Sequence, residues 1–197
     1  MNPRPLALRA LQLLLGLFLF GLAIALMVRG GLGLGPWDAF HQGLSRLTGF
    51  SIGSVILGVG VLVVLFTTTI GVRPGPGTGA NILLIGPAVD LVLPLLPAAP
   101  SRAWGLLYLL AGIGLSGVAT GTYIAAGFGK GPRDGLMLGL SRYTGLPVRR
   151  VRTSIELTVL LLGWLMGGAI GVGTLVFTLA IGPAVQWGLE LFGIGHA

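Results

Sequence analysis

The chain has 197 residues, of which 54% are hydrophobic and 9% charged, with a net charge of +7 and a mean hydropathy of +0.96. A soluble domain carries about 25% charged residues, so this composition excludes an ordinary soluble protein and predicts an integral membrane protein. The absence of cysteine excludes disulfides, thiolate chemistry and cysteine-ligated metals. The positive charges lie mainly between apolar runs, which favours a membrane topology signal over a nucleic-acid partner.

The chain begins with a short basic segment, residues 1–10, which holds Arg4 and Arg9. An apolar run over about 11–28 follows. This run is too long for a typical signal peptide and shows no small-residue cleavage site, so we expect a retained first membrane span.

Residues 31–49, GLGLGPWDAFHQGLSRLTG, form an unusual polar segment. Pro36 follows Gly35 and suits the first position of a helix, where no N–H group is needed. Asp38 in the first turn and Gly49 after the last turn match the two ends of a helix over 36–48. Such a helix is about 20 Å long, whereas the hydrocarbon core of a bilayer is about 30 Å thick. We therefore expect a helix that does not cross the membrane and is either re-entrant or interfacial.

Five further apolar segments are expected to cross the membrane. Four of them cover about 51–70, 80–96, 104–126 and 174–191. The remaining one, which is the fifth span of the chain, begins after a basic patch at Arg149, Arg150 and Arg152 and ends near 170. Pro87 after Gly86 and Pro183 after Gly182 lie within the third and sixth spans. A proline inside a helix removes a backbone hydrogen bond, so both positions predict a kink.

The polar segment returns at residues 127–145 as GFGKGPRDGLMLGLSRYTG, 96 positions later, so that Asp38 corresponds to Asp134. The same offset relates Gly86-Pro87 to Gly182-Pro183 and holds across nearly the whole chain without a gap. Because the matches include Gly, Pro, Asp, Ser and Arg, they indicate an internal duplication. The halves are residues 1–97 and 98–197, and a second short helix is expected over 132–144, beginning after Gly131 at Pro132.

Three spans in each half would place the two halves in opposite orientations in the membrane. With the N-terminus inside, 9 of the 12 Lys and Arg residues lie in inner segments, as the positive-inside rule requires. A comparison of the halves agrees, because five basic residues of the second half replace uncharged residues of the first. These are Lys130, Arg133, Arg149, Arg150 and Arg152 in place of Leu34, Trp37, Gly53, Ser54 and Ile56. We predict an all-α membrane protein of six transmembrane helices in two inverted repeats, with both termini in the cytoplasm.

These segments resemble the YczE/YyaS/YitT group of bacterial membrane proteins, and above all its YczE-like branch. The resemblance covers nearly the whole chain and is carried by GLGLGPWDxxHQGLSRLTGxSIG in the first half and by GPRDGLMxGLSRxTG, RxxIELxVLLxGW and GxGTxxFxxxIGP in the second. It implies a multi-pass protein of the bacterial inner membrane whose activity is poorly defined.

Acidic residues are few, and each has a structural as well as a functional interpretation. Asp38 and Asp134 either complement the ends of the short helices or form a proton or cation site near the membrane centre. Asp90 and its counterpart Gln186 either line a cavity beside the predicted kinks or lie at the hydrated membrane surface. Glu156 follows Arg152 by four residues, which favours an ion pair on one helix. His41 is a lone imidazole, and we expect a structural role for it.

Arg46 and Arg142 complete the candidate site. Arg46 lies in an outer segment, where the positive-inside rule does not favour it. If the two short helices pack antiparallel, Asp38 would approach Arg142 and Asp134 would approach Arg46, and these ion pairs would clamp the halves together. The predicted solute, ion or gating site is Asp38, Asp134, Arg46, Arg142, Asp90 and Gln186, and the predicted helix breaks are at Gly35, Pro36, Gly86, Pro87, Gly131, Pro132, Gly182 and Pro183.

Three functions are compatible with this sequence. The first is a small transporter or channel, and the second is a non-transporting assembly factor or partner subunit. An intramembrane enzyme comes last, because no catalytic constellation, metal set or nucleotide-binding loop is present, and no cofactor is expected. The expected partners are the lipid bilayer and an unknown small solute or ion, with a homo-oligomer or a membrane partner as further options and no nucleic acid.

Overall fold

The computed structural model describes residues 5–194, and within this range it contains helices and no strand. The helices are α1 (Leu6–Gly30), α2 (Pro36–Thr48), α3 (Ile52–Thr69), α4 (Pro76–Val92), a 3₁₀ turn η1 (Leu93–Leu95), α5 (Arg102–Ala125), α6 (Pro132–Thr144), α7 (Val148–Leu165) and α8 (Val172–Glu190). The all-α prediction is confirmed, and both short helices have the predicted bounds.

Five helices in the described range are long and apolar enough to cross a membrane, namely α1, α3, α4 with η1, α5 and α8. α7 has 18 residues but carries Arg149, Arg150, Arg152 and Glu156, and it is not among the five. α2 and α6 have 13 residues each, which is too short for a span. The protein is therefore polytopic, and its apolar helices are consistent with contact with a lipid bilayer.

The two short helices begin and end in the same way because the same residues recur in both halves. Each starts with a proline, Pro36 or Pro132, that follows an extended glycine. Each ends at a left-handed glycine, with φ of 78° at Gly49 and 70° at Gly145. This conformation is common after a helix and costs glycine little, so the breaks are encoded locally.

The other two predicted break points behave differently. Pro87 lies inside α4 and Pro183 lies inside α8, and the helix runs on through each of them. A proline removes only one backbone hydrogen bond, which the rest of a long packed helix tolerates. Gly86-Pro87 and Gly182-Pro183 therefore do not end their helices.

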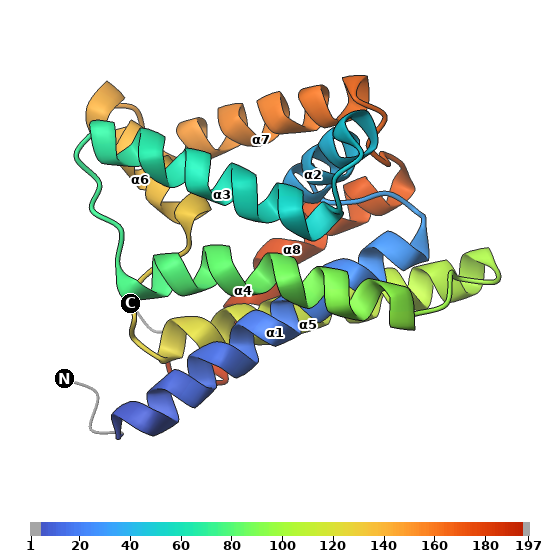
Figure 1. Ribbon diagram of the computed structural model, residues 1–197, viewed down its shortest axis with the longest axis horizontal. Helices are drawn as coiled ribbons and strands as arrows, with labels where there is room; N and C mark the ends of the chain where they lie inside the picture. The colour runs from blue at the N-terminus through green and yellow to red at the C-terminus, as the bar shows by residue number, and fades with distance from the viewer. Residues whose placement is uncertain (1–4, 195–197) are drawn as a thin grey trace.

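The centre of the molecule is the antiparallel pair α1 and α5 (Figure 1). Gly16 near the start of α1 lies against Tyr123 near the end of α5, and Gly30 at the end of α1 lies against Gly105 at the start of α5. Glycine lets the two backbones approach closely, as is usual between membrane helices. α4 packs beside α1, and α8 packs beside α5.

Each short helix packs on a long helix of the other half, α2 on α7 and α6 on α3, and Figure 1 shows α2 and α6 toward opposite ends of the molecule. Two of the backbone hydrogen bonds between the halves are related by the duplication. Gly77 N donates to Phe128 O at 2.8 Å, and Gly173 N donates to Leu32 O at 2.8 Å. Donors and acceptors are each 96 positions apart, so one bond is the copy of the other.

One packing contact of the first half has no copy in the second. α3 packs along α4, whereas α7 makes no comparable contact with α8 in the described chain. A Cβ at Gly53 of α3 would lie 2.1 Å from Gly86 O of α4, which shows how closely these helices approach. At the corresponding positions the second half has Arg149 and Gly182, and a Cβ at Gly182 would meet nothing within 4 Å. The close α3–α4 contact therefore has no counterpart between α7 and α8, where arginine stands in place of the glycine of α3.

Candidate functional site

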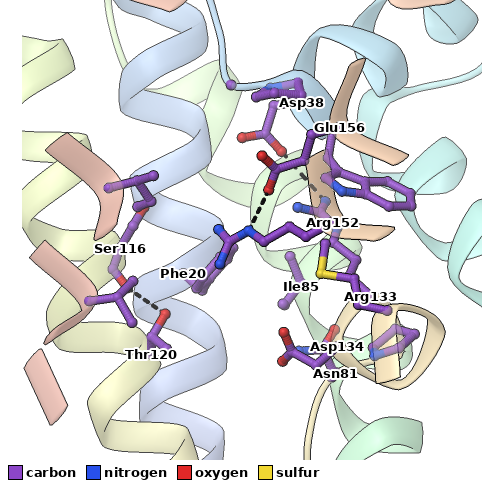
Figure 2. Close-up of a pocket in the computed structure, with 18 of the residues that line it drawn as sticks. Phe20, Asp38, Asn81, Ile85, Ser116, Thr120, Arg133, Asp134, Arg152 and Glu156 are labelled. Carbon is purple, nitrogen blue, oxygen red and sulfur yellow. Dashed lines mark hydrogen bonds and ion pairs between the residues drawn. The ribbon is translucent and has the colours of Figure 1, made fainter. Parts of the chain in front are cut away.

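A cavity of about 830 Å³ lies between the two halves and is lined by residues of all eight α-helices in the described chain. This volume falls in the usual range of small-molecule sites, about 300–1,000 Å³. Figure 2 shows lining side chains drawn from α1, α2, α4, α5, α6 and α7 around this space. The ionisable lining residues are Asp38, His41, Tyr123, Arg133, Asp134, Arg149, Arg152 and Glu156.

The cavity concentrates the acidic residues of the chain. Three of the five Asp and Glu residues line it, namely Asp38, Asp134 and Glu156. Since ionisable groups are costly at membrane depth, such a concentration is a pointer to function. The first turns of α2 and α6 supply the two aspartates, because Asp38 and Asp134 each lie two residues after the proline that starts the helix.

The starts of the two short helices meet through Arg133 of α6. Arg133 Nη2 lies 3.6 Å from Asp38 Oδ1 and 3.4 Å from His41 Nδ1. The Arg133 guanidinium carbon lies 5.0 Å from the centroid of the Trp37 ring, a cation–π geometry. Trp37 and Arg133 occupy corresponding positions of the two halves. In the sequence Arg133 is recognisable only as a topology signal, and its pairing with Asp38 was not predicted.

Two buried polar atoms beside Arg133 lack a hydrogen-bond partner among the described residues. They are Trp37 Nε1, a donor, and Asp38 Oδ1, an acceptor. Trp37 is 8% exposed and Asp38 is 5% exposed, and both line the cavity. Buried polar groups nearly always form hydrogen bonds, so this donor and this acceptor are groups whose missing hydrogen bonds a polar ligand or water in the cavity would supply.

The short helices are not membrane-spanning segments, and burial shifts the titration of their ionisable groups. Burial raises the pKa of the Asp38 carboxyl, and the Arg133 guanidinium opposes this shift. Burial also raises the pKa of Asp134, against the effect of the neighbouring Lys130 and other cations. The pKa of His41 is lowered well below its usual value by burial and by Arg133, so the imidazole is neutral.

α7 brings a second charge pair to the cavity. Arg152 Nε donates to Glu156 Oε1 at 2.8 Å, four residues apart on the same helix, which confirms the predicted ion pair. The two side chains are 54% and 27% exposed, respectively. Figure 2 shows this pair in the cavity between Asp38 and Asp134. Among the described residues, Asp134 and Arg149 take part in no ion pair.

The predicted clamp is wrong in its pairing. Within the described chain no ion pair joins Asp38 to Arg142 or Asp134 to Arg46. The reason is geometric, since α2 packs on α7 and α6 packs on α3 instead of the two short helices lying antiparallel. The Arg46 guanidinium donates to Gly167 O, outside the cavity. Asp38 and Asp134 do share the cavity, whereas Arg46 and Arg142 do not line it.

Asp90 and Gln186 occupy corresponding positions of the two halves, but only Gln186 lines the cavity. Asp90 Oδ2 accepts from Ser51 Oγ at 2.5 Å, and Asp90 Oδ1 accepts from Gly53 N at 2.8 Å. Asp90 therefore caps the start of α3 and does not line the cavity. Gln186 does line the cavity, and its Nε2 donates to Glu190 Oε1 at 2.9 Å.

Comparisons with known proteins agree with the predicted resemblance. Residues 7–189 match the model of DUF6198, a family of unknown function. The chain is 37% identical over 177 residues to "Uncharacterized membrane protein YczE" of Bacillus subtilis (strain 168), covering 88% of this chain and 82% of that protein. An "Uncharacterized protein" of Haemophilus influenzae is 36% identical over 179 residues, with 91% and 82% covered. "Uncharacterized protein YyaS" of Bacillus subtilis is 29% identical over 167 residues, with 82% and 83% covered. No solved structure matches the chain.

Proposed function

We propose a function for this chain from the premise that it belongs to DUF6198, a family of unknown function. The names of its relatives give a membrane location in one case and no activity, so the proposal rests on the cavity. We infer that the protein is a small transporter or channel in which the cavity is the site for a polar solute or ion. The observation that carries this inference is the cavity itself, which all eight α-helices line and which holds three of the five acidic residues beside an unpaired donor and acceptor. We do not propose an enzymatic activity.

Two inverted repeats, residues 1–97 and 98–197, are part of the proposal. The duplicated hydrogen bonds at Gly77 and Gly173 and the antiparallel packing of α1 on α5 support it. In this topology α7 is the fifth of six spans, and its arginines lie near the cytoplasmic surface. Both termini are then cytoplasmic, and by analogy with the bacterial relatives the membrane is the bacterial inner membrane.

The inverted topology predicts opposite labelling of two equivalent threonines. Thr48 and Thr144 end the two short helices, occupy corresponding positions and are exposed. Because the chain has no cysteine, Thr48→Cys and Thr144→Cys each create a single thiol. A membrane-impermeant maleimide should label Cys at 48 only from the periplasmic side and Cys at 144 only from the cytoplasmic side of oriented vesicles. Labelling of both from one side would contradict inversion.

If a solute passes through the cavity, a small reagent should reach the centre of the cavity from both sides of the membrane. Ser116 of α5 lines the cavity and is 2% exposed. We expect Ser116→Cys to react with a small impermeant methanethiosulfonate reagent added on either side of the membrane. Thr67→Cys is the control, since Thr67 is 3% exposed but does not line the cavity, and it should react slowly from both sides.

Reaction of Ser116→Cys from one side only would contradict a transport pathway. The alternative, a non-transporting assembly factor or partner subunit, would then be favoured, because a fixed cavity open to one side serves binding and not passage. Co-purification of a defined membrane partner, or of a second copy of the chain, would be the next observation in that case.

A further inference from the structure

The cavity carries ionisable groups of both signs in equal number. Three carboxylates line it, at Asp38, Asp134 and Glu156, and three guanidinium groups line it, at Arg133, Arg149 and Arg152. A site for a simple anion or a simple cation gains from a surplus of the opposite charge, since an uncompensated charge away from water is costly. A cavity with equal numbers of acidic and basic groups is instead complementary to a ligand that carries both a positive and a negative charge.

Incompletely paired groups of both signs also line the cavity. At the acidic end, Asp134 has no ion pair among the described residues, and Asp38 Oδ1 has no hydrogen bond. At the basic end, Arg149 has no ion pair within the described range, although its neighbour Arg152 is paired with Glu156. The cavity therefore offers one acidic and one basic group without an ion pair in the described chain, Asp134 on α6 and Arg149 on α7.

The position of these groups relative to the opening gives the ligand a direction. Among the residues that line the cavity, the exposed ones all lie on α7 and α8. They are Arg149, Arg152, Thr178, Gly182 and Gln186. The cavity therefore opens where α7 and α8 are separated, with the exposed Arg149 at the mouth and Asp134, which is only partly exposed, further inside.

We propose that the ligand is a small zwitterion, whose cationic group lies at Asp134 and whose anionic group lies at Arg149. The inference rests on the proposed function, because it names the chemical class of the solute for the same cavity. An ammonium group offsets the charge of Asp134, which has no ion pair among the described residues. A carboxylate or phosphate accepts from the Arg149 guanidinium at the mouth. The apolar lining residues, such as Phe20, Ile85 and Val185, surround the body that links the two charges.

The test is a thermal-shift series on the purified full chain in detergent. The zwitterions are glycine, 4-aminobutyrate and 6-aminohexanoate, which differ only in the distance between their charges. Butyrate, hexanoate and butylamine at the same concentration and matched ionic strength are the single-charge controls. A ligand that binds only the folded state raises the unfolding temperature. We expect at least one zwitterion to raise it and the single-charge compounds to leave it unchanged.

Matched variants place the binding in the cavity. Asp134→Asn and Arg149→Gln should each weaken the apparent affinity for the stabilising zwitterion by at least about tenfold, as loss of one charge-assisted contact does. Arg150→Gln and Asp90→Asn are the controls, since neither residue lines the cavity, and both should keep the affinity. Retained affinity in both cavity variants would overturn the proposal.

Two further results would also overturn it. A single-charge compound that stabilises the protein as much as any zwitterion would show that balance of charge is not recognised, and no shift with any compound would show that the class is wrong. These outcomes are separate from the labelling of Ser116→Cys, because binding in detergent requires no passage. Binding of a zwitterion with one-sided labelling would reject transport alone, and two-sided labelling without binding would reject the zwitterion alone.

Discussion

Gly86→Ala is expected to destabilise the protein by about 1–3 kcal/mol or more, the cost of overpacking a close helix contact. A Cβ at Gly86 would lie 2.3 Å from Gly53 O, a backbone atom that cannot move aside without shifting α3 from α4. Gly182→Ala, at the corresponding position of the second half, is expected to be neutral or slightly stabilising. A Cβ there meets nothing within 4 Å, and alanine favours a helix over glycine by about 0.5–1 kcal/mol.

The two variants are compared by thermal unfolding of the purified protein in detergent. Because they make the same substitution at equivalent positions of a duplicated chain, they control for each other. A similar loss of stability in both would mean that α7 packs on α8 as closely as α3 packs on α4. The cavity would then have no opening between α7 and α8, and Arg149 would not lie at its mouth.

Local features of this fold could be predicted from the sequence, and the packing between halves could not. Helices 36–48 and 132–144 were predicted with their observed bounds because a proline starts each one and a left-handed glycine follows it. The duplication itself is visible in the sequence because polar and turn residues recur at one offset. The pairing of Asp38 was predicted wrongly, because the partner depends on which long helix each short helix packs against.

The replacement of glycine by arginine between the halves was visible in the sequence but was interpreted only as a topology signal. Arg149 and Glu156 stand in place of Gly53 and Gly60. In the structure the glycines let α3 approach α4, whereas the charged residues lie on α7 and line the cavity. A duplicated chain can thus gain a polar site in one half by losing a helix contact there. Nothing in the sequence indicated that Asp90 caps α3. The hydrogen bonds that Asp90 accepts from Ser51 and Gly53 join segments far apart in sequence.

Arg133→Gln is expected to cost about 3 kcal/mol of stability, since it leaves the buried Asp38 carboxylate without its charged partner. Asp38→Asn should also destabilise, because it removes the charge that Arg133 faces. In the double variant neither charge is left alone, so the combined loss should be smaller than the sum of the single losses by about 0.5–3 kcal/mol. Unfolding in detergent under one set of conditions measures all four proteins of this double-mutant cycle.

The control cycle combines Asp38→Asn with Arg142→Gln. Arg142 lies in the last turn of α6, whereas Arg133 lies at its start, and only Arg133 forms an ion pair with Asp38 in the described chain. Losses in this control cycle should add within about 0.5 kcal/mol. Coupling to Arg142 and none to Arg133 would restore the antiparallel clamp predicted from the sequence. Coupling to Arg133 alone would mean that the starts of the two short helices hold the halves together at the cavity, through the contact between Asp38 of α2 and Arg133 of α6.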